Sequence, residues 1–204
     1  MKSSFPNMKT YADIFADTQY VDGEKVEYEI IFGNEKIVFI KSGAGGSLRG
    51  YKEKYLKMAR RVHERIGATV ICASNPDAPH EELDEAKIRW VIDEMGLSNF
   101  EIYFIGASDG AYHNLSLAKR FSETVKWVGI NTSYINVSNL EERLVALSAI
   151  SKTMVYGTED DDFNEVVPTL RKMECNKFEL KFVDGADHNF TGMVEKFIAL
   201  ADEF

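Results

Sequence analysis

The sequence has 204 residues, of which 45% are hydrophobic, and a formal net charge of -9 from 24 Lys and Arg against 33 Asp and Glu. This length and content predict a single domain with a sizeable core, and the negative charge argues against binding to nucleic acid or to an anionic membrane. The first ten residues lack the apolar centre of a signal peptide, and no run approaches the ~20 apolar residues of a membrane span, so we expect a cytoplasmic protein. Two cysteines, Cys72 and Cys175, are too few for a disulfide framework or a metal site, and both are expected to be structural thiols.

The first part of the chain predicts a hairpin followed by a buried strand. Residues 18–21 and 26–32 flank an Asp-Gly pair, which tolerates the positive φ angles of a tight turn. Residues 36–41 have a continuously apolar centre, which is typical of a strand covered on both faces. We treat residues 1–17 as an N-terminal extension, and a glycine-rich loop at 42–46 follows the third strand.

Helix and strand patterns alternate through the rest of the chain. Further strands are predicted at residues 69–73, 101–105, 125–130, 153–156 and 178–183. Helices with an apolar stripe are predicted at residues 51–66, from near Pro79 to 95, at 111–118 and 140–147, from near Pro168, and at 193–204. Gly67 and Gly96 end the first two helices. Three strands joined by turns and five separated by helices predict an α/β fold whose mostly parallel sheet has helices on both faces.

The most informative stretch is 104–110, Phe-Ile-Gly-Ala-Ser-Asp-Gly, which places Ser108 between a predicted strand and a predicted helix. A serine in so sharp a turn needs very small neighbours two positions away, and Gly106 and Gly110 meet that need. The pattern Gly-x-Ser-x-Gly can also occur by chance around a serine that lies in an ordinary turn. The order of strand, turn and helix favours a nucleophile instead.

A serine hydroxyl is a weak nucleophile that needs a neighbouring base, and the base needs a group to orient it. Ser108, Asp160 and His188 follow the fifth, seventh and eighth predicted strands. The carboxyl ends of parallel strands share one edge of the sheet, so we expect these three side chains to lie close together. Asp161 and Asp162 are alternatives to Asp160, because turn assignments carry errors of a few residues.

The other histidines are weaker candidates for the base. His63 and His80 precede the serine, and His113 falls within the helix that follows it. The loop at 42–46 lacks the Gly-Lys-Ser/Thr ending of a phosphate-binding loop, which argues against a nucleotide site.

This arrangement resembles the α/β-hydrolase superfamily, in which the triad runs Ser, then Asp or Glu, then His along the chain. The resemblance spans about residues 18–204 and rests on the Ser108 motif, the loop at 42–46, the acidic turn after Gly157 and the sequence Gly-Ala-Asp-His that ends at His188. It implies one domain over 1–204 with an eight-stranded, mostly parallel sheet. It also implies an oxyanion hole formed by the backbone N–H groups of Ala44 and Asp109.

Two features set the sequence apart from common members of that superfamily. Ser42 stands where a histidine often precedes the glycine of the oxyanion loop, and Ser108 differs from the cysteine nucleophile of dienelactone hydrolases. The segment 131–139, where many members insert a lid, is short, so any lid must be minimal.

The resemblance implies a serine hydrolase that cleaves a small carboxylic ester through an acyl-enzyme intermediate. A thioesterase or an amidase would use the same triad, and a non-catalytic ligand-binding or interaction protein on the same fold is the alternative from another class. The expected partner is a small-molecule acyl substrate. No cofactor and no metal are implied.

Overall fold

The computed structural model describes residues 14–77, 80–132, 137–172 and 178–203. Cys175 lies outside these ranges, whereas Cys72 is a buried free thiol whose pKa is raised by burial. The described part contains one sheet made of the strands β1 (Phe15–Val21), β2 (Glu24–Ile31), β3 (Asn34–Lys41), β4 (Ala68–Ala73), β5 (Glu101–Ala107), β6 (Thr124–Ile130), β7 (Ser151–Gly157) and β8 (Phe178–Val183).

The strands are ordered β1-β2-β4-β3-β5-β6-β7-β8. The pairs β1–β2 and β2–β4 are antiparallel, and the pairs from β4 to β8 are parallel. The α/β fold with an eight-stranded, mostly parallel sheet is therefore confirmed. Its helices are α1 (Lys54–Ile66), α2 (Glu81–Met95), α3 (Asp109–Ala118), α4 (Val137–Ala146), α5 (Phe163–Lys172) and α6 (Val194–Ala199), with short 3-10 segments η1 (Tyr51–Glu53) and η2 (Leu200–Glu203).

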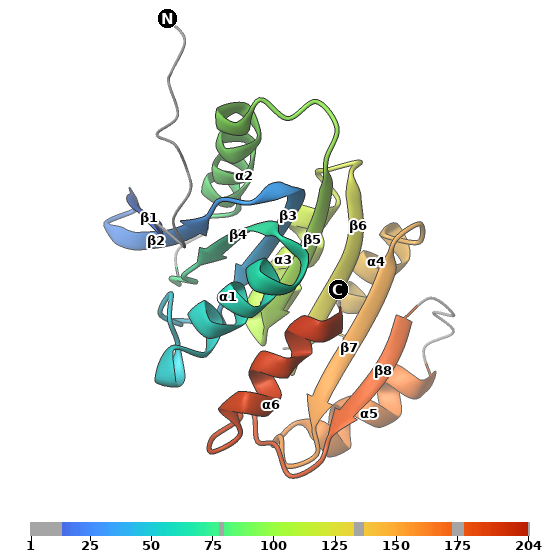
Figure 1. Ribbon diagram of the computed structural model, residues 1–204. Coiled ribbons are helices and arrows are strands. Elements are labelled where there is room, and N and C mark those ends of the chain that lie inside the picture. Colours follow the sequence, from blue (N-terminus) through green and yellow to red (C-terminus); the bar gives the residue numbers. More distant parts are fainter. Residues whose placement is uncertain (1–13, 78–79, 133–136, 173–177, 204) are drawn as a thin grey trace, which may run out of the picture.

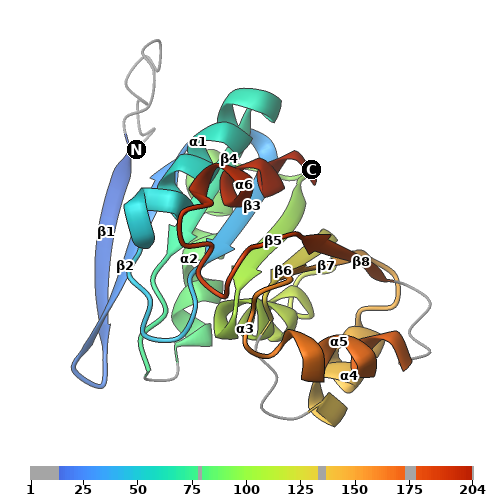
Figure 2. The same cartoon turned by 90° about the horizontal axis from the view of Figure 1, so that it is seen from below.

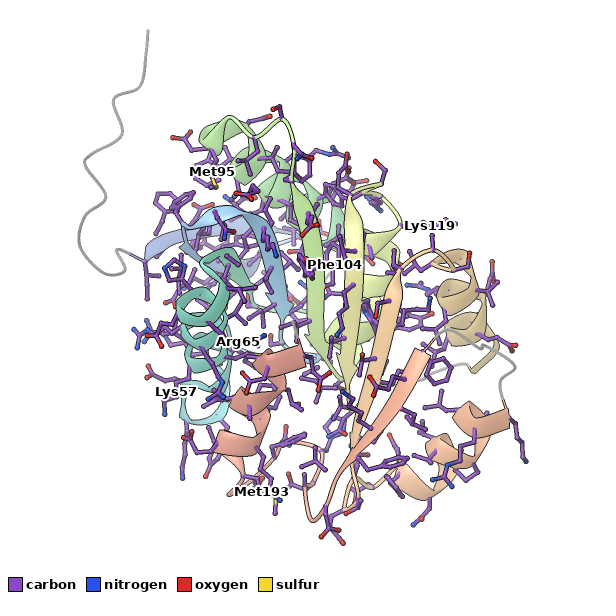
Figure 3. The ribbon with its side chains drawn as sticks, turned by 45° about the vertical axis from the view of Figure 1, so that its right-hand side comes forward. Lys57, Arg65, Met95, Phe104, Lys119 and Met193 are labelled. Carbon is purple, nitrogen blue, oxygen red and sulfur yellow. The ribbon has the colours of Figure 1, made fainter. Side chains whose placement is uncertain are left out.

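Helices cover both faces of the sheet, as Figures 1 and 2 show, with α1 and α6 on one face and α2 to α5 on the other. Each face has its own core, because neighbouring residues of a strand point to opposite sides. On the central strand β5, Phe104 belongs to the core under α2 to α5 and Ile105 to the core under α1 and α6. Figure 3 labels Phe104 at the centre of the sheet, where it is fully buried.

Two element boundaries differ from the sequence-based predictions. β1 begins at Phe15, inside the stretch expected to be an N-terminal extension. The helix predicted to start near Pro168 starts at Phe163, and that prediction was wrong. Its first turn is closed by hydrogen bonds from the N–H groups of Glu165 and Val166 to the carbonyl of Asp162, so the proline falls inside the helix rather than at its start.

The predicted turn and helix ends are confirmed. Asp22 and Gly23 have φ angles of +49° and +84°, as the tight hairpin turn requires. Gly67 and Gly96 end α1 and α2 in the left-handed conformation.

The segment 131–139, where we expect at most a minimal lid, includes residues 133–136, which lie outside the described ranges, and its last three residues belong to α4. None of the helices in the described ranges has the length and apolar character needed to cross a membrane.

Candidate active site

Ser108 lies between β5 and α3 with φ +51° and ψ −126°, a conformation that non-glycine residues rarely adopt. Both motif glycines are required by close backbone contacts. A Cβ atom on Gly106 would lie 2.3 Å from the Cα of Ala111, and one on Gly110 would lie 2.0 Å from the carbonyl oxygen of Ser42. The strand, sharp turn and helix predicted around Ser108 are therefore present.

The Ser108 turn is fixed to the neighbouring strand and to the oxyanion loop, residues 42–46. The N–H of Ser108 donates to the carbonyl of Ile130 at the end of β6, at 2.8 Å. A Cβ atom on Gly43 would lie 3.1 Å from the Cβ of Ser108, so this loop passes directly beside the serine. The hydroxyl side chain is half-buried.

Asp160 and His188 are in direct contact. The Oδ2 atom of Asp160 lies 2.7 Å from Nδ1 of His188, and Oδ1 accepts a hydrogen bond from the backbone N–H of Asp162 at 2.9 Å. The Asp160 side chain is 2% exposed and that of His188 is 37% exposed. The hydrogen bond with Asp160 is the main cause that raises the pKa of His188 above its ordinary value of 6.5. Asp161 and Asp162 are exposed, which leaves Asp160 as the residue of this turn that reaches the ring.

Ser108 and His188 follow strands of the same parallel set. Within the described ranges, the hydroxyl of Ser108 makes no hydrogen bond to His188. Catalytic hydrogen bonds are often long without substrate and shorten when it binds. The structure thus brings Asp160 and His188 together and places Ser108 at the same edge of the sheet.

The remaining histidines have other partners. His113 lies between two carboxylates, with Nε2 at 3.0 Å from Asp109 and Nδ1 at 2.9 Å from Glu81. The hydrogen bond to Asp109 is the main cause that raises the pKa of His113, and it lowers the pKa of Asp109 in turn. His63 contacts the carbonyl of Ala68 through Nδ1, and His80 is buried 3.8 Å from Asp84.

The expected oxyanion donors are free in the described part of the chain, where neither the N–H of Ala44 nor that of Asp109 donates to a protein acceptor. Asp109 is the first residue of α3, and the N–H groups of a first helical turn have no acceptor within the helix. Two backbone donors beside the serine can stabilise an oxyanion.

The oxyanion loop is held by side-chain contacts that could not be predicted from the sequence. Ser42, at the position of the missing histidine, donates through Oγ to the carbonyl of Gly46 at 2.9 Å and so closes the loop on itself. Asn75 is fully buried; its backbone N–H donates to Gly46, and its side-chain amide donates to the carboxylate of Asp109 at 3.1 Å. Asn75 therefore connects the two segments that carry the expected donors.

A buried ion pair adjoins the same loop. Lys41 precedes Ser42 and is fully buried, with Nζ at 2.6 Å from Asp84 and 3.1 Å from the carbonyl of Ser74. Tyr28 donates to the other oxygen of Asp84 at 2.9 Å. Burial is the main cause that lowers the pKa of Lys41, and the charge of Asp84 opposes it.

Lys54 is a second buried cation and contacts the residue after His188. It starts α1, is 4% exposed, and donates to the carbonyl of Asn189 at 3.0 Å. Its ammonium lies 4.5 Å from the ring centre of Phe197. Burial lowers the pKa of Lys54 to about 8, partly offset by the charge of Asp187.

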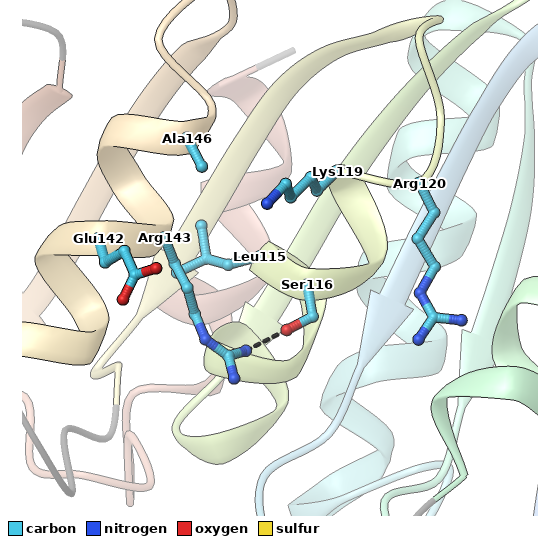
Figure 4. Close-up of a pocket in the computed structure, with 7 residues that line it drawn as sticks. All are labelled: Leu115, Ser116, Lys119, Arg120, Glu142, Arg143 and Ala146. Carbon is cyan, nitrogen blue, oxygen red and sulfur yellow. Dashed lines mark hydrogen bonds between the residues drawn. The ribbon is translucent and has the colours of Figure 1, made fainter.

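Two cavities lie away from the candidate catalytic residues. One, of about 480 Å³, lies between α3 and α4, where the guanidinium of Arg143 bonds to the hydroxyl of Ser116 (Figure 4). The other, of about 330 Å³, is lined by Lys57 of α1, by the start of α6 and by Met193, which directly precedes α6; Lys57 and Met193 are labelled in Figure 3. Ser108, Asp160 and His188 line neither of them. In the described part of the chain, no group of three or more His, Cys, Asp and Glu side chains could hold a metal ion.

No family model and no curated protein matches the sequence. Many solved structures match the fold, among them Est1E from Butyrivibrio proteoclasticus, at 14% identity and a TM-score of 0.67 over 93% of this chain and 96% of that one. An alpha-beta serine hydrolase homologue from Coxiella burnetii has 16% identity and a TM-score of 0.68 over 93% and 96% of the two chains. XC6422 from Xanthomonas campestris, described as a serine hydrolase without a lid, has 16% identity and a TM-score of 0.67 over 99% and 95%. At these identities the likeness shows the fold, and the chain has the α/β-hydrolase fold.

Proposed function

We propose that this protein is a serine hydrolase that cleaves a small carboxylic ester through Ser108, His188 and Asp160. The 2.7 Å contact between Asp160 and His188, formed at the sheet edge where the strained Ser108 follows β5, is the observation that carries the proposal. A buried carboxylate on Nδ1 orients the imidazole and leaves Nε2 for the serine proton. The likeness in fold to serine hydrolases and esterases supports the same class of reaction.

In the proposed reaction, the Oγ of Ser108 attacks the ester carbonyl while Nε2 of His188 accepts its proton. The N–H groups of Ala44 and Asp109 donate to the oxyanion of the tetrahedral intermediate, each contributing about 3 kcal/mol. The intermediate expels the alcohol, which takes the proton back from His188, and an acyl-serine remains. A water molecule then attacks the acyl carbon by the same steps, which releases the carboxylic acid and restores the serine.

Esters are the first choice of substrate because an alcohol leaves with less help from a proton donor than an amine does. Thioesters and amides pass through the same tetrahedral intermediate, so both belong in the first assays. For XC6422, the absence of a lid is part of its description, and a minimal lid here would leave the serine open to small soluble esters.

The test combines covalent labelling with a substrate panel. A fluorophosphonate should form an adduct on Ser108, which mass spectrometry of the digested protein locates. p-Nitrophenyl esters of increasing acyl length, one thioester and one anilide then rank the leaving groups. Ser108→Ala should abolish both labelling and turnover. Ser116→Ala, which changes a serine of α3 away from the Ser108 turn, should retain both.

A folded protein without an adduct, or with an adduct on another serine, contradicts the proposal. Circular dichroism and thermal unfolding of the same samples verify the fold. That outcome favours the non-catalytic binding protein, because a strained serine beside free backbone donors then serves only as structure or as a ligand contact.

A further inference from the structure

Asn131 follows β6 directly and lies between the two loops that carry the acid and the base. Its side chain is 2% exposed, and its φ angle is +44°. The Oδ1 atom accepts a hydrogen bond from the N–H of Gly157 at 2.8 Å. The Nδ2 atom donates to the carbonyls of Asp187 at 3.2 Å and of His188 at 3.0 Å.

These bonds join the elements on which the proposed triad depends. Gly157 ends β7 and its carbonyl accepts from the N–H of Asp160 at 3.2 Å, so the oxygen of the Asn131 amide holds the turn of the acid. The nitrogen of the same amide holds the loop of the base. The preceding residue, Ile130, accepts from the N–H of Ser108, so two consecutive residues contact all three catalytic segments.

The positive φ angle alone does not explain this residue. Asparagine is tolerated in the left-handed region, but glycine adopts it with less strain. The amide instead matches three polar backbone groups, two acceptors on one loop and one donor on the other, with a single planar group that has both donors and acceptor. This match is what glycine would lose.

We propose that Asn131 is a positioning residue that sets the distance between Asp160 and His188. The role rests on the proposed function, in which His188 is the base. The gap between the two side chains depends on how the two loops are spaced, and the Asn131 amide is bonded to both. Without it the loops can separate and the ring can turn, and a displacement of about 1 Å at a catalytic group costs about 10²-fold in rate.

A change at Asn131 can be read through the pKa of His188. The charged groups that act on this ring are Asp160, Asp162 and Lys54. Asn131 is neutral, so replacing it with glycine adds and removes no charge. Burial of the ring lowers the pKa of His188, so greater exposure in this variant would raise the pKa, whereas a weaker contact with Asp160 would lower it. A fall in the pKa of His188 therefore reports a weaker contact with Asp160.

The test compares Asn131→Gly with Thr124→Val, a control at the opposite end of β6. Thr124 is also buried and donates through its hydroxyl to the carbonyls of Ala118 and Phe121, both at 2.9 Å, so the control also removes buried hydrogen bonds to backbone but leaves the catalytic loops intact. Both variants are compared with the wild type in ester hydrolysis against pH, in NMR titration of the histidine ring and in thermal unfolding.

Asn131→Gly should lower kcat about 10²-fold and move the pKa of His188 down toward 6.5, while KM changes little. Thr124→Val should lower the melting temperature but leave kcat and the pKa of His188 as in the wild type. An Asn131→Gly protein that is less stable yet has an unchanged kcat and an unchanged His188 pKa overturns the proposal.

A second variant covers the case in which the glycine protein does not fold. Asn131→Asp tolerates the positive φ angle and keeps the oxygen that accepts from Gly157, but a carboxylate cannot donate to the carbonyls of Asp187 and His188. Its kcat is measured at the pH where His188 is neutral. A loss of about 10²-fold supports the proposal, and a wild-type kcat overturns it.

The NMR titration needs no substrate, so it separates this proposal from the proposed function. If the wild type has no hydrolase activity but the pKa of His188 still falls in Asn131→Gly, the proposed function is wrong and the positioning role stands. If the wild type is active but the pKa of His188 stays constant in Asn131→Gly, the proposed function stands and the positioning role is wrong.

Discussion

Replacing Lys54 with methionine should raise the free energy of unfolding above that of the wild type near neutral pH. This difference between the two proteins should become smaller as the pH rises toward about 10. Lys54 is 4% exposed and its ammonium has one hydrogen-bond acceptor, the carbonyl of Asn189, with no carboxylate within 4 Å in the described part of the chain. Methionine fills a similar volume and keeps contact with the aromatic ring of Phe197 without a charge.

The magnitude follows from the pKa of this lysine, which burial lowers from 10.5 to about 8. Between these two values the unfolded chain binds a proton that the folded chain does not, so stability rises with pH across this window. Linkage gives a cost for the buried charge of about 3 kcal/mol at about pH 7 and about 1 kcal/mol at about pH 9.5. Between these two pH values, the free energy of unfolding of the wild type should therefore rise by about 2 kcal/mol relative to that of Lys54→Met.

Urea unfolding of both proteins at several pH values measures this difference. Contributions of tyrosines and of Cys72 cancel, because both proteins contain them. Lys57→Met, which removes an exposed lysine from the same helix, should follow the wild type at every pH. If the wild type and Lys54→Met keep a constant difference from about pH 7 to about pH 9.5, the reasoning from a buried, destabilised ammonium is wrong.

Three further changes test the site. Asp160→Asn should lower kcat about 10⁴-fold, because the amide favours the wrong imidazole tautomer, while the exposed Asp161→Asn should change it only a few-fold; equal losses would contradict the choice of acid. The value of kcat/KM should rise through one ionisation above about pH 6.5, since Asp160 raises the pKa of His188 and only the neutral ring accepts a proton, and this rise should persist in His113→Ala. Asp84→Asn should lower the free energy of unfolding by about 3–5 kcal/mol in urea, because it leaves Lys41 buried without a counter-charge, and a loss below about 1 kcal/mol would show that the pair is hydrated.

The parts of the fold that follow from local rules could be predicted from the sequence. The Asp-Gly turn and the glycines that end α1 and α2 have positive φ angles that other residues adopt poorly, and the glycines around Ser108 leave no room for a Cβ atom. The mostly parallel sheet also follows, because alternating strands and helices allow few arrangements. The helix around Pro168 could not be placed in the same way, since its start depends on bonds to the carbonyl of Asp162, which any residue type can supply.

Some parts of the candidate site could likewise be predicted from the sequence, and others could not. Ser108, Asp160 and His188 could be proposed from the sequence because a serine hydrolase needs a hydroxyl, a carboxylate and an imidazole, and because strand ends bring such residues to one edge. The contacts of Ser42, Asn75, Lys54 and Asn131 could not be predicted, because each of these residues bonds to a backbone group, and a backbone group has no sequence signature. In the sequence, Asn131 is only the first residue of the short segment 131–139, where a lid could occur.

Asn131 and Lys54 hold three consecutive carbonyls of one loop, those of Asp187, His188 and Asn189, yet they act on His188 in different ways. Asn131 is neutral and acts through distance, so its loss should lower the pKa of His188 by weakening the contact with Asp160. Lys54 is charged and lowers that pKa directly, so Lys54→Met should raise it. Opposite shifts in the two variants would separate spacing from charge at the same loop, whereas shifts of the same sign would mean that both residues act only by keeping the loop in place.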